Sequence, residues 1–228
     1  MGVGCQVPGA GVSAFQCRNE RKFNAETGKW YNARKSYQER CSVKVLAISG
    51  SRDPEGQTAA AVGAVLKGAR SAGSEVEVLY LPAMNIERCR QCDADGWGLC
   101  RREGRCVIED DLARVMDKIE GADAVIFATP VYFSDLSESL RAFLDRLRRI
   151  SLNEKASYGL EGKPVVGICV AGGGGGGAPA CAANLDRILS IIRFDVVDMA
   201  LARRQNLEAK LPGLRLMGKW LASAGSSG

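Results

Sequence analysis

The chain has 228 residues, 46% of them hydrophobic, which is enough to bury the core of one α/β domain. Its net charge is +5, but residues 1–42 hold seven basic and three acidic side chains, so the remainder is almost neutral and unsuited to nucleic acid. No apolar run approaches the roughly 20 residues that cross a bilayer, and the N-terminus lacks the order of a secretory signal. We therefore expect a cytoplasmic protein that binds neither nucleic acid nor membrane.

The chain contains nine cysteines and no histidine. The lack of histidine excludes histidine-based triads, histidine general bases and the common histidine-containing zinc sites. Four cysteines cluster between residues 89 and 106, and in a reducing compartment such a cluster indicates metal or redox chemistry more than disulfides. Cys169 and Cys181 lie elsewhere and are predicted to pack in the core as small hydrophobic side chains.

Strands and helices alternate from residue 43 onward, whereas residues 1–42 show no periodicity and are predicted to form a loosely ordered N-terminal extension. Short apolar runs closed by turn residues predict strands, and each of the first four is followed by a segment with helical spacing. The five predicted strands are Val43–Ile48, Val76–Leu81, Ala124–Ala128, Pro164–Val170 and Phe194–Leu201.

The predicted helices carry apolar faces that would cover such strands. Thr58–Ala72 has helical spacing, Asp110 suits the N-cap of the next helix, and Pro179 suits the first turn of a later one. Residues 205–228 form a C-terminal segment, in which Leu207–Trp220 is predicted to be a short helix folding over the site and the last residues a tail. Five strands alternating with helices predict a parallel sheet covered on both faces.

Ligands of such sheets bind at the carboxyl ends of the strands, where three unusual loops of this chain fall. The first loop, residues 49–58, is rich in small and hydroxyl residues and precedes a helix, so it suits a phosphate. It lacks the Lys-Ser/Thr of a nucleotide triphosphatase and the GxGxxG order of a dinucleotide site. A plain turn could have the same composition.

The second loop, residues 129–134, places two aromatic side chains at a strand end, where they suit a flat ligand or a packing contact with a neighbouring loop. The third loop begins at Ala171 and contains six consecutive glycines. Because so many glycines cost conformational entropy, the run indicates close approach of the backbone to a ligand more than a flexible linker.

The three loops in this order resemble the NAD(P)H-dependent FMN reductase and iron–sulfur flavoprotein family of the flavodoxin-like superfamily. The resemblance covers residues 43–204 and implies a three-layer sandwich with a five-stranded parallel sheet, order 2-1-3-4-5, and helices on both faces. It also implies FMN as cofactor, with Arg52 displaced by one position from the family's pattern. The implied binding residues are Ser49, Ser51, Arg52, Gln57, Thr58, Thr129, Pro130, Val131, Tyr132, Phe133, Ser134, Ala171, Gly172, Gly173 and Gly174.

A cysteine-rich insertion at residues 88–107 resembles the compact cysteine motif of the iron–sulfur branch, with a longer middle gap. The predicted metal ligands are Cys89, Cys92, Cys100 and Cys106. Four thiolates suit a [4Fe–4S] cluster or one tetrahedral zinc, and free thiols are a third alternative.

These features predict an FMN-dependent oxidoreductase that passes electrons from NAD(P)H to a small-molecule or protein acceptor. The flavin would carry the chemistry, so no catalytic side chain is required. One alternative is an iron–sulfur flavoprotein that exchanges single electrons with ferredoxin-type partners, and another is a non-catalytic binding module on the same fold. The resemblance implies a homodimer or homotetramer.

Overall fold

The computed structural model describes residues 21–24, 29–32, 42–153 and 158–224. The chain divides into two units, residues 1–41 and 42–228. In the first unit, β1 (Arg21–Asn24) pairs with β2 (Lys29–Asn32) in an antiparallel hairpin that the sequence analysis did not predict. Of the rest of the predicted N-terminal extension, Ser42 begins the second unit and the other residues lie outside the described residues.

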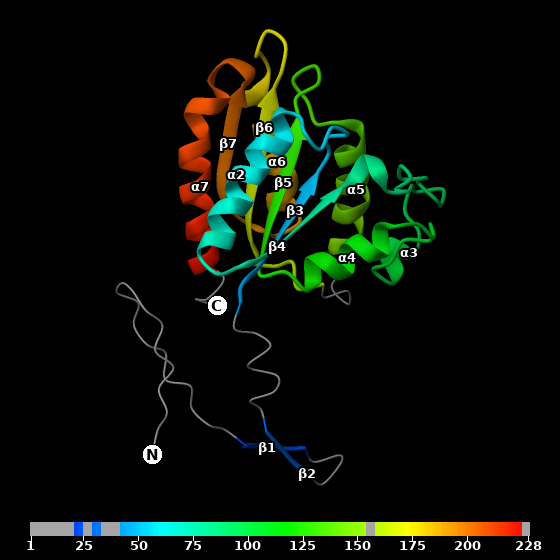
Figure 1. The fold of residues 1–228 in the computed structure, drawn as a ribbon. Coiled ribbons are helices and arrows are strands. Elements are labelled where there is room, and N and C mark those ends of the chain that lie inside the picture. Colours follow the sequence, from blue (N-terminus) through cyan, green and yellow to red (C-terminus); the bar gives the residue numbers. More distant parts are fainter. Residues whose placement is uncertain (1–20, 25–28, 33–41, 154–157, 225–228) are drawn as a thin grey trace, which may run out of the picture. The chain divides into compact units, whose positions relative to one another are not determined.

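The second unit is built on a five-stranded sheet in which every neighbouring pair of strands is parallel. The strand order is β4-β3-β5-β6-β7, which is the predicted flavodoxin-like order 2-1-3-4-5 (Figure 1). The predicted α/β fold is therefore confirmed. The strands of this sheet are β3 (Lys44–Ser49), β4 (Glu75–Tyr80), β5 (Ala124–Pro130), β6 (Pro164–Ala171) and β7 (Asp195–Arg203).

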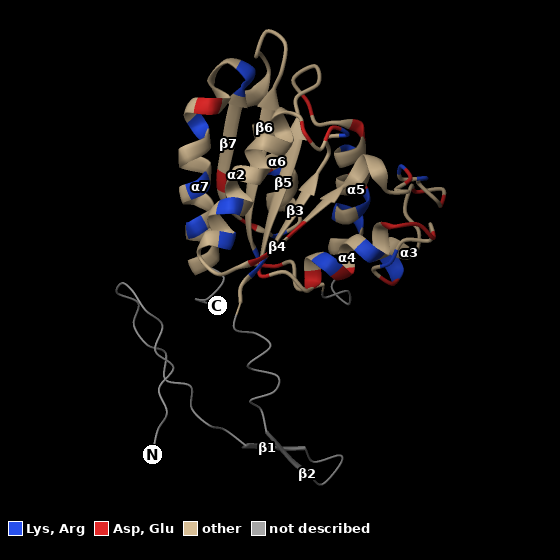
Figure 2. Ribbon diagram, in the orientation of Figure 1, with Lys and Arg blue, Asp and Glu red and all other residues tan. Residues whose placement is uncertain are grey.

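The three inner strands are apolar because helices cover both of their faces. Strands β5 and β6 carry no charged residue, and Figure 2 draws both in tan, the colour of residues that are neither acidic nor basic. The edge strand β4 alternates exposed and partly buried side chains over its first four residues, as expected where one side of the strand lacks a neighbour.

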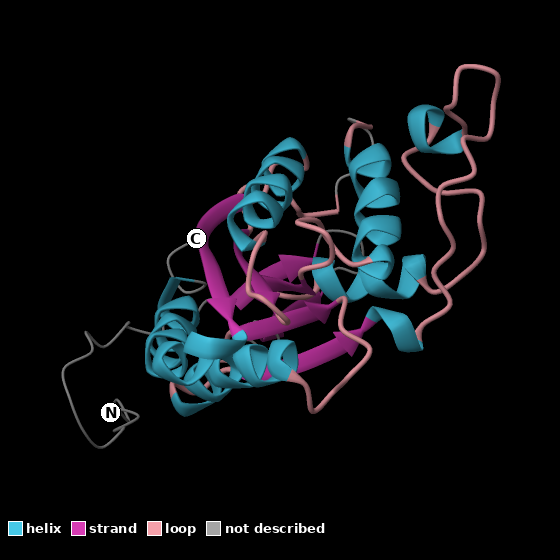
Figure 3. Ribbon diagram, turned by 90° about the horizontal axis from the view of Figure 1, so that it is seen from above, coloured by secondary structure: helices cyan, strands magenta, loops and turns pink. Residues whose placement is uncertain are grey.

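Two layers of helices enclose the sheet, as Figure 3 shows from above. Helices α2 and α7 pack over one face, and helices α4, α5 and α6 over the other. A short helix, α3 (Leu99–Arg102), belongs to the cysteine-rich segment, which extends outward from these layers (Figure 3). The larger helices are α2 (Gln57–Ser71), α4 (Leu112–Glu120), α5 (Glu138–Ser151), α6 (Ala178–Ile191) and α7 (Leu207–Ala224).

Helix α7 runs along α2 and does not fold over the strand ends as the sequence analysis predicted. The two helices approach closely because each has a glycine at the crossing. A methyl group on Gly68 would lie 2.0 Å from the carbonyl oxygen of Arg215, and one on Gly218 would lie 1.9 Å from that of Val65. Within the described residues, no helix combines the length and apolarity that a membrane span needs.

Candidate functional site

The first loop of the site follows β3 and is ordered by its own side chains. Ser49 Oγ accepts a hydrogen bond from the Ser51 backbone N–H (3.2 Å), and Asp53 Oδ1 accepts one from the Glu55 N–H (3.0 Å). Helix α2 then begins with Gly56 as its N-cap and no side-chain hydrogen bond to the cap. Its first N–H groups therefore retain the positive end of the helix dipole for an anion.

The second loop, after β5, contains strained backbone. Phe133 and Ser134 have φ angles of 48° and 66°, which are uncommon for residues with a side chain. The strain is held by a bridge in which Tyr132 and Asp135 exchange backbone hydrogen bonds of 3.0 and 2.9 Å. The ring of Phe133 is fully exposed and that of Tyr132 is 45% exposed, so neither belongs to the core.

Asp135 anchors the second loop to the two helices beside it. Its carboxylate accepts hydrogen bonds from Arg141 of α5 and from Asn184 Nδ2 of α6 (3.2 Å). Burial alone would raise the pKa of Asp135, but the hydrogen bond from the Leu136 N–H and the charge of Arg141 outweigh it and lower that pKa. The carboxylate therefore stays ionised and keeps the loop fixed.

The third loop joins β6 to α6 and contacts the second loop. Gly177 has a φ angle of 79°, and a methyl group there would lie 2.7 Å from Ser134 Cα, so only glycine permits the contact. On its other side, Gln205 Nε2 donates a hydrogen bond to the Gly173 carbonyl (3.3 Å). The turn η2 (Arg204–Asn206), which follows β7, is thus a fourth part of the site.

The loops surround a cavity of about 860 Å³ at the carboxyl ends of the strands. Most of the predicted flavin-binding residues line it: Ser51, Gln57, Thr58, Pro130, Val131, Tyr132, Phe133, Ala171, Gly172, Gly173 and Gly174. Four of the predicted residues are not among the lining residues, namely Ser49, Arg52, Thr129 and Ser134. Of these, Ser49 supports Ser51, and Thr129 Oγ1 accepts the Ser137 N–H (2.9 Å), so both hold the loops from behind.

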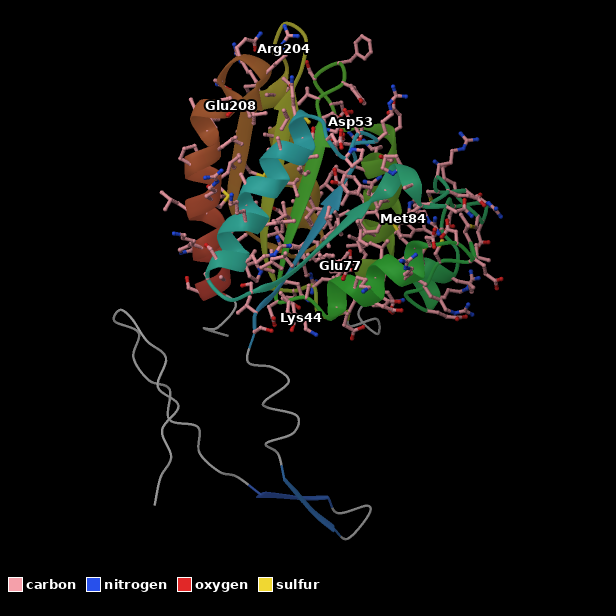
Figure 4. All side chains as sticks on the ribbon, viewed as in Figure 1. Lys44, Asp53, Glu77, Met84, Arg204 and Glu208 are labelled. Atoms are coloured by element: carbon pink, nitrogen blue, oxygen red, sulfur yellow. The ribbon has the colours of Figure 1, made fainter. Side chains whose placement is uncertain are left out.

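Several lining residues were missed by the sequence analysis, namely Asp53, Gly56, Val170, Gly175, Gly176 and Arg204. The most informative is Arg204, because it and Asp53 are the only charged side chains among the described lining residues. Figure 4 shows both at the end of the sheet opposite Lys44, where β3 begins. Of the two arginines, Arg204 borders the cavity and Arg52 does not.

A second cavity lies in the cysteine-rich segment and is lined by all four predicted metal ligands, Cys89, Cys92, Cys100 and Cys106. It is small, about 20 Å³. In the described residues, no three cysteine, histidine or acidic side chains are grouped so that they could hold one metal ion. Trp97, within this segment, lies under the guanidinium groups of Arg149 and Arg101, at 4.7 and 5.7 Å from the ring centre.

The segment is fastened to α5 by a buried ion pair. Arg146 and Asp110 form a salt bridge with side chains 1% and 0% exposed. Burial alone would raise the pKa of Asp110, but hydrogen bonds from Arg146 and from the Glu87 and Leu112 N–H groups lower it. Asp110 Oδ1 accepts a hydrogen bond from the Leu112 N–H (3.1 Å) at the start of α4, but the N-cap of this helix is Asp111 and not Asp110 as predicted. Asp110 also neutralises a buried arginine that was not predicted.

The remaining described cysteines are structural. Cys169 of β6 and Cys181 of α6 are both fully buried, as the sequence analysis expected. Hydrogen bonding to Cys181, together with burial, raises the pKa of Cys169 far above its ordinary value, so this thiol stays protonated.

The comparison that decides the family is a match of residues 43–205 to the model described as NADPH-dependent FMN reductase. The chain belongs to this family. Among curated relatives of this family member, an iron–sulfur flavoprotein of Methanocaldococcus jannaschii is 33% identical over 131 residues, 58% of this chain and 65% of the relative. An iron–sulfur flavoprotein of Methanosarcina thermophila is 30% identical over 130 residues, 57% of this chain and 64% of the relative. The family member thus spans a little under two thirds of their lengths.

Solved structures confirm the fold of this FMN reductase family member. An NAD(P)H:quinone oxidoreductase from Methanothermobacter marburgensis superposes with a TM-score of 0.60 at 20% identity, covering 79% of this chain and 98% of that one. A flavodoxin from the domain Archaea superposes with a TM-score of 0.52 at 13% identity, covering 81% and 99%. At these identities the likeness shows the flavodoxin-like fold alone.

Proposed function

We propose that the protein binds FMN in the cavity at the strand ends and is an oxidoreductase that passes electrons from NAD(P)H to a small-molecule or protein acceptor. The observation that carries this proposal is the convergence of the three predicted loops on one cavity of about 860 Å³. Membership of the NADPH-dependent FMN reductase family supports the same cofactor. When bound, FMN supplies hydride and single-electron chemistry that side chains lack.

The cavity fits the parts of FMN. Ser51, Gln57 and Thr58 line it beside the uncapped start of α2, and they would hold the phosphate. On the far side, Gly172, Gly174 and Gly176 have no heavy atom within 4 Å of where a methyl group would lie, so their backbone borders open space. These glycines and the Tyr132–Phe133 loop would hold the flat ring system between them.

Arg204 would stabilise negative charge in the cavity. Its guanidinium has no ion-pair partner among the described residues, whereas Asp53 is engaged by the N–H of Glu55. A positive charge already present at the cavity before the reaction favours any state with added negative charge, including reduced flavin. Full exposure of Phe133 supports the proposal that the protein is a homodimer or homotetramer whose neighbouring subunit covers this ring.

The test is titration of FMN with the full chain and with the double variant Ser51→Ala/Thr58→Ala. Quenching of the flavin fluorescence measures the binding. Loss of two hydrogen bonds to a charged phosphate should weaken binding by about a hundredfold or more, since each is worth about 1.5–3 kcal/mol and each 1.4 kcal/mol is about tenfold. Ser71→Ala, at the other end of α2, is the matched control, because its hydroxyl donates only to the Gly68 carbonyl. Equal FMN affinity in all three proteins would contradict the phosphate site, and failure of the wild type to bind FMN would favour the non-catalytic alternative.

The cysteine segment supports a second function, exchange of single electrons with ferredoxin-type partners through a [4Fe–4S] cluster. All four candidate sulfur ligands border one cavity, and the described residues that line it include no other type of metal ligand. The curated relatives named iron–sulfur flavoproteins support this proposal as well. Because the cavity is only about 20 Å³, the segment would have to widen to admit a cluster.

Zinc is the alternative occupant of the four thiolates. A tetrahedral zinc with Zn–S bonds of about 2.3 Å would bring its sulfur atoms to within roughly 4 Å of one another. In a cubane cluster each cysteine would bind a different iron, so the thiols would stand farther apart. Metal analysis distinguishes the two.

Anaerobic purification with iron, sulfide and zinc analysis tests this second function. About four irons and four sulfides per chain are expected. Cys92→Ser should lower the iron content, whereas Cys181→Ala, which alters a buried thiol in α6, should leave it unchanged. One zinc per chain, or iron retained equally by both variants, would contradict the cluster assignment.

A further inference from the structure

Arg146 is the residue of α5 that faces the cysteine-rich segment from the protein interior. Its side chain is 1% exposed, in contrast to Arg148 on the same helix, which is 42% exposed. Burying a guanidinium group costs free energy unless its N–H groups have hydrogen-bond acceptors. The contacts of Arg146 therefore indicate its role.

The guanidinium group joins both ends of the segment. Nη1 donates a hydrogen bond to the Glu87 carbonyl (3.0 Å), two residues before Cys89, and Nη2 donates to the Ile108 carbonyl (3.4 Å), two residues after Cys106. Asp110 completes the closure, since Nη2 donates to its Oδ1 (2.9 Å) and its Oδ2 accepts the Glu87 N–H (2.8 Å). The two ends stay fixed even if the loop between them widens.

The same group also contacts a sulfur atom. Nη2 of Arg146 lies 3.3 Å from Cys106 Sγ, within hydrogen-bond distance. A neutral thiol is a weak acceptor, whereas a thiolate, or a thiolate bound to a metal, is a strong one. The buried Nε–H of Arg146 has no acceptor among the described residues, and Arg146 lines the cavity. Arg146 therefore borders a cavity lined by sulfur and holds one buried donor without an acceptor among the described residues.

We infer that Arg146 is a positioning residue for the four-cysteine site, holding the Cys106 sulfur and raising the reduction potential of the cluster bound there. The inference rests on the proposed iron–sulfur function. Reduction adds one electron to a cluster and therefore increases the negative charge on its sulfur ligands. A hydrogen bond from a guanidinium group to a ligand sulfur favours that more negative form, because such bonds and the nearby charge set cluster potentials.

The test compares Arg146→Lys with Arg149→Lys in full chains reconstituted anaerobically with iron and sulfide. Lysine keeps the positive charge of Arg146 but cannot contact Asp110 and Cys106 with one planar fork. Arg149 is the matched control, because it also contacts the segment, through the Gly96 carbonyl (2.7 Å) and Trp97, but has no hydrogen bond to a cysteine among the described residues.

The readouts are iron content, thermal unfolding and the cluster potential, titrated with dithionite and followed by electron paramagnetic resonance. We expect Arg146→Lys to shift the potential to a more negative value while Arg149→Lys leaves it at the wild-type value. If Arg146→Lys does not fold, the neutral pair Asp110→Asn/Arg146→Gln replaces it, and the same shift is expected.

Two results would overturn the inference, and they differ. If the wild-type protein takes up no cluster, both the proposed iron–sulfur function and the proposed role of Arg146 are wrong. If the wild-type protein binds a cluster and the variants have the same cluster potential, only the proposed role of Arg146 is wrong, even if the iron content of a variant falls.

Discussion

Gly68 of α2 faces the backbone carbonyl of Arg215 in α7, and a methyl group on Gly68 would lie 2.0 Å from that oxygen. Backbone cannot yield as a flexible side chain can, so Gly68→Ala should push the helices apart. We expect a loss of about 1–3 kcal/mol in the free energy of unfolding, measured by urea denaturation. Gly63→Ala on the same helix meets no atom within 4 Å and should instead stabilise the protein by about 0.5–1 kcal/mol. Equal effects would mean that the crossing is not tightly packed.

Gly174 offers the opposite test, in which binding changes and stability does not. A methyl group there meets nothing within 4 Å, and the residue lines the large cavity. Gly174→Ala should therefore leave the urea midpoint near the wild-type value but weaken FMN binding, because the methyl group occupies space reserved for the flavin. Fluorescence titration measures the affinity, with Gly63→Ala as control. Unchanged affinity would show that FMN does not rest on this glycine.

Two arginines compete for the role of the cation in the cavity. Arg204 lines it, whereas Arg52, which the sequence pattern favoured, does not. We expect Arg204→Ala to weaken binding of reduced FMN by about tenfold or more, the worth of a hydrogen bond to a charged group. Arg52→Ala should have a smaller effect. Anaerobic titration of both variants with reduced FMN decides between the two arginines. A larger loss of affinity in Arg52→Ala than in Arg204→Ala would favour Arg52 as the cation.

Asp110 should make the free energy of unfolding depend on pH in the acid range. Its pKa is lowered in the folded protein, so its contribution is present above the unfolded-state value of about 3.9 and is lost as the pH falls through the folded value. Asp110→Asn leaves a buried guanidinium unpaired and should cost about 3–5 kcal/mol at pH 7. The difference from wild type should therefore hold down to about pH 4 and shrink below it, as the pH falls toward the folded-state pKa, and urea denaturation at each pH follows it. Parallel curves would show that this carboxylate does not titrate with unfolding.

The fold was predictable because its signals are local. Uninterrupted apolar runs mark the inner strands, and strand order follows from the family resemblance. The conformation of the first loop was not predictable, since hydrogen bonds of Ser49, Ser51 and Asp53 decide which side chains line the cavity. Arg204 was missed because its loop follows β7, whose approach to the glycine loop is a tertiary contact. Burial of Arg146 could have been predicted from the sequence, because it lies three residues after Phe143 on the buried face of α5.

The cavity at the strand ends is assembled from four stretches of chain that are far apart in the sequence, from Ser51 to Arg204. None of these stretches can form its part of the surface until the sheet brings them together. Any molecule that binds there selects the completed fold and stabilises it by mass action, by about 2.7 kcal/mol at a concentration one hundred times Kd. If FMN binds there as proposed, its supply is expected to raise the resistance of this protein to heat and proteolysis.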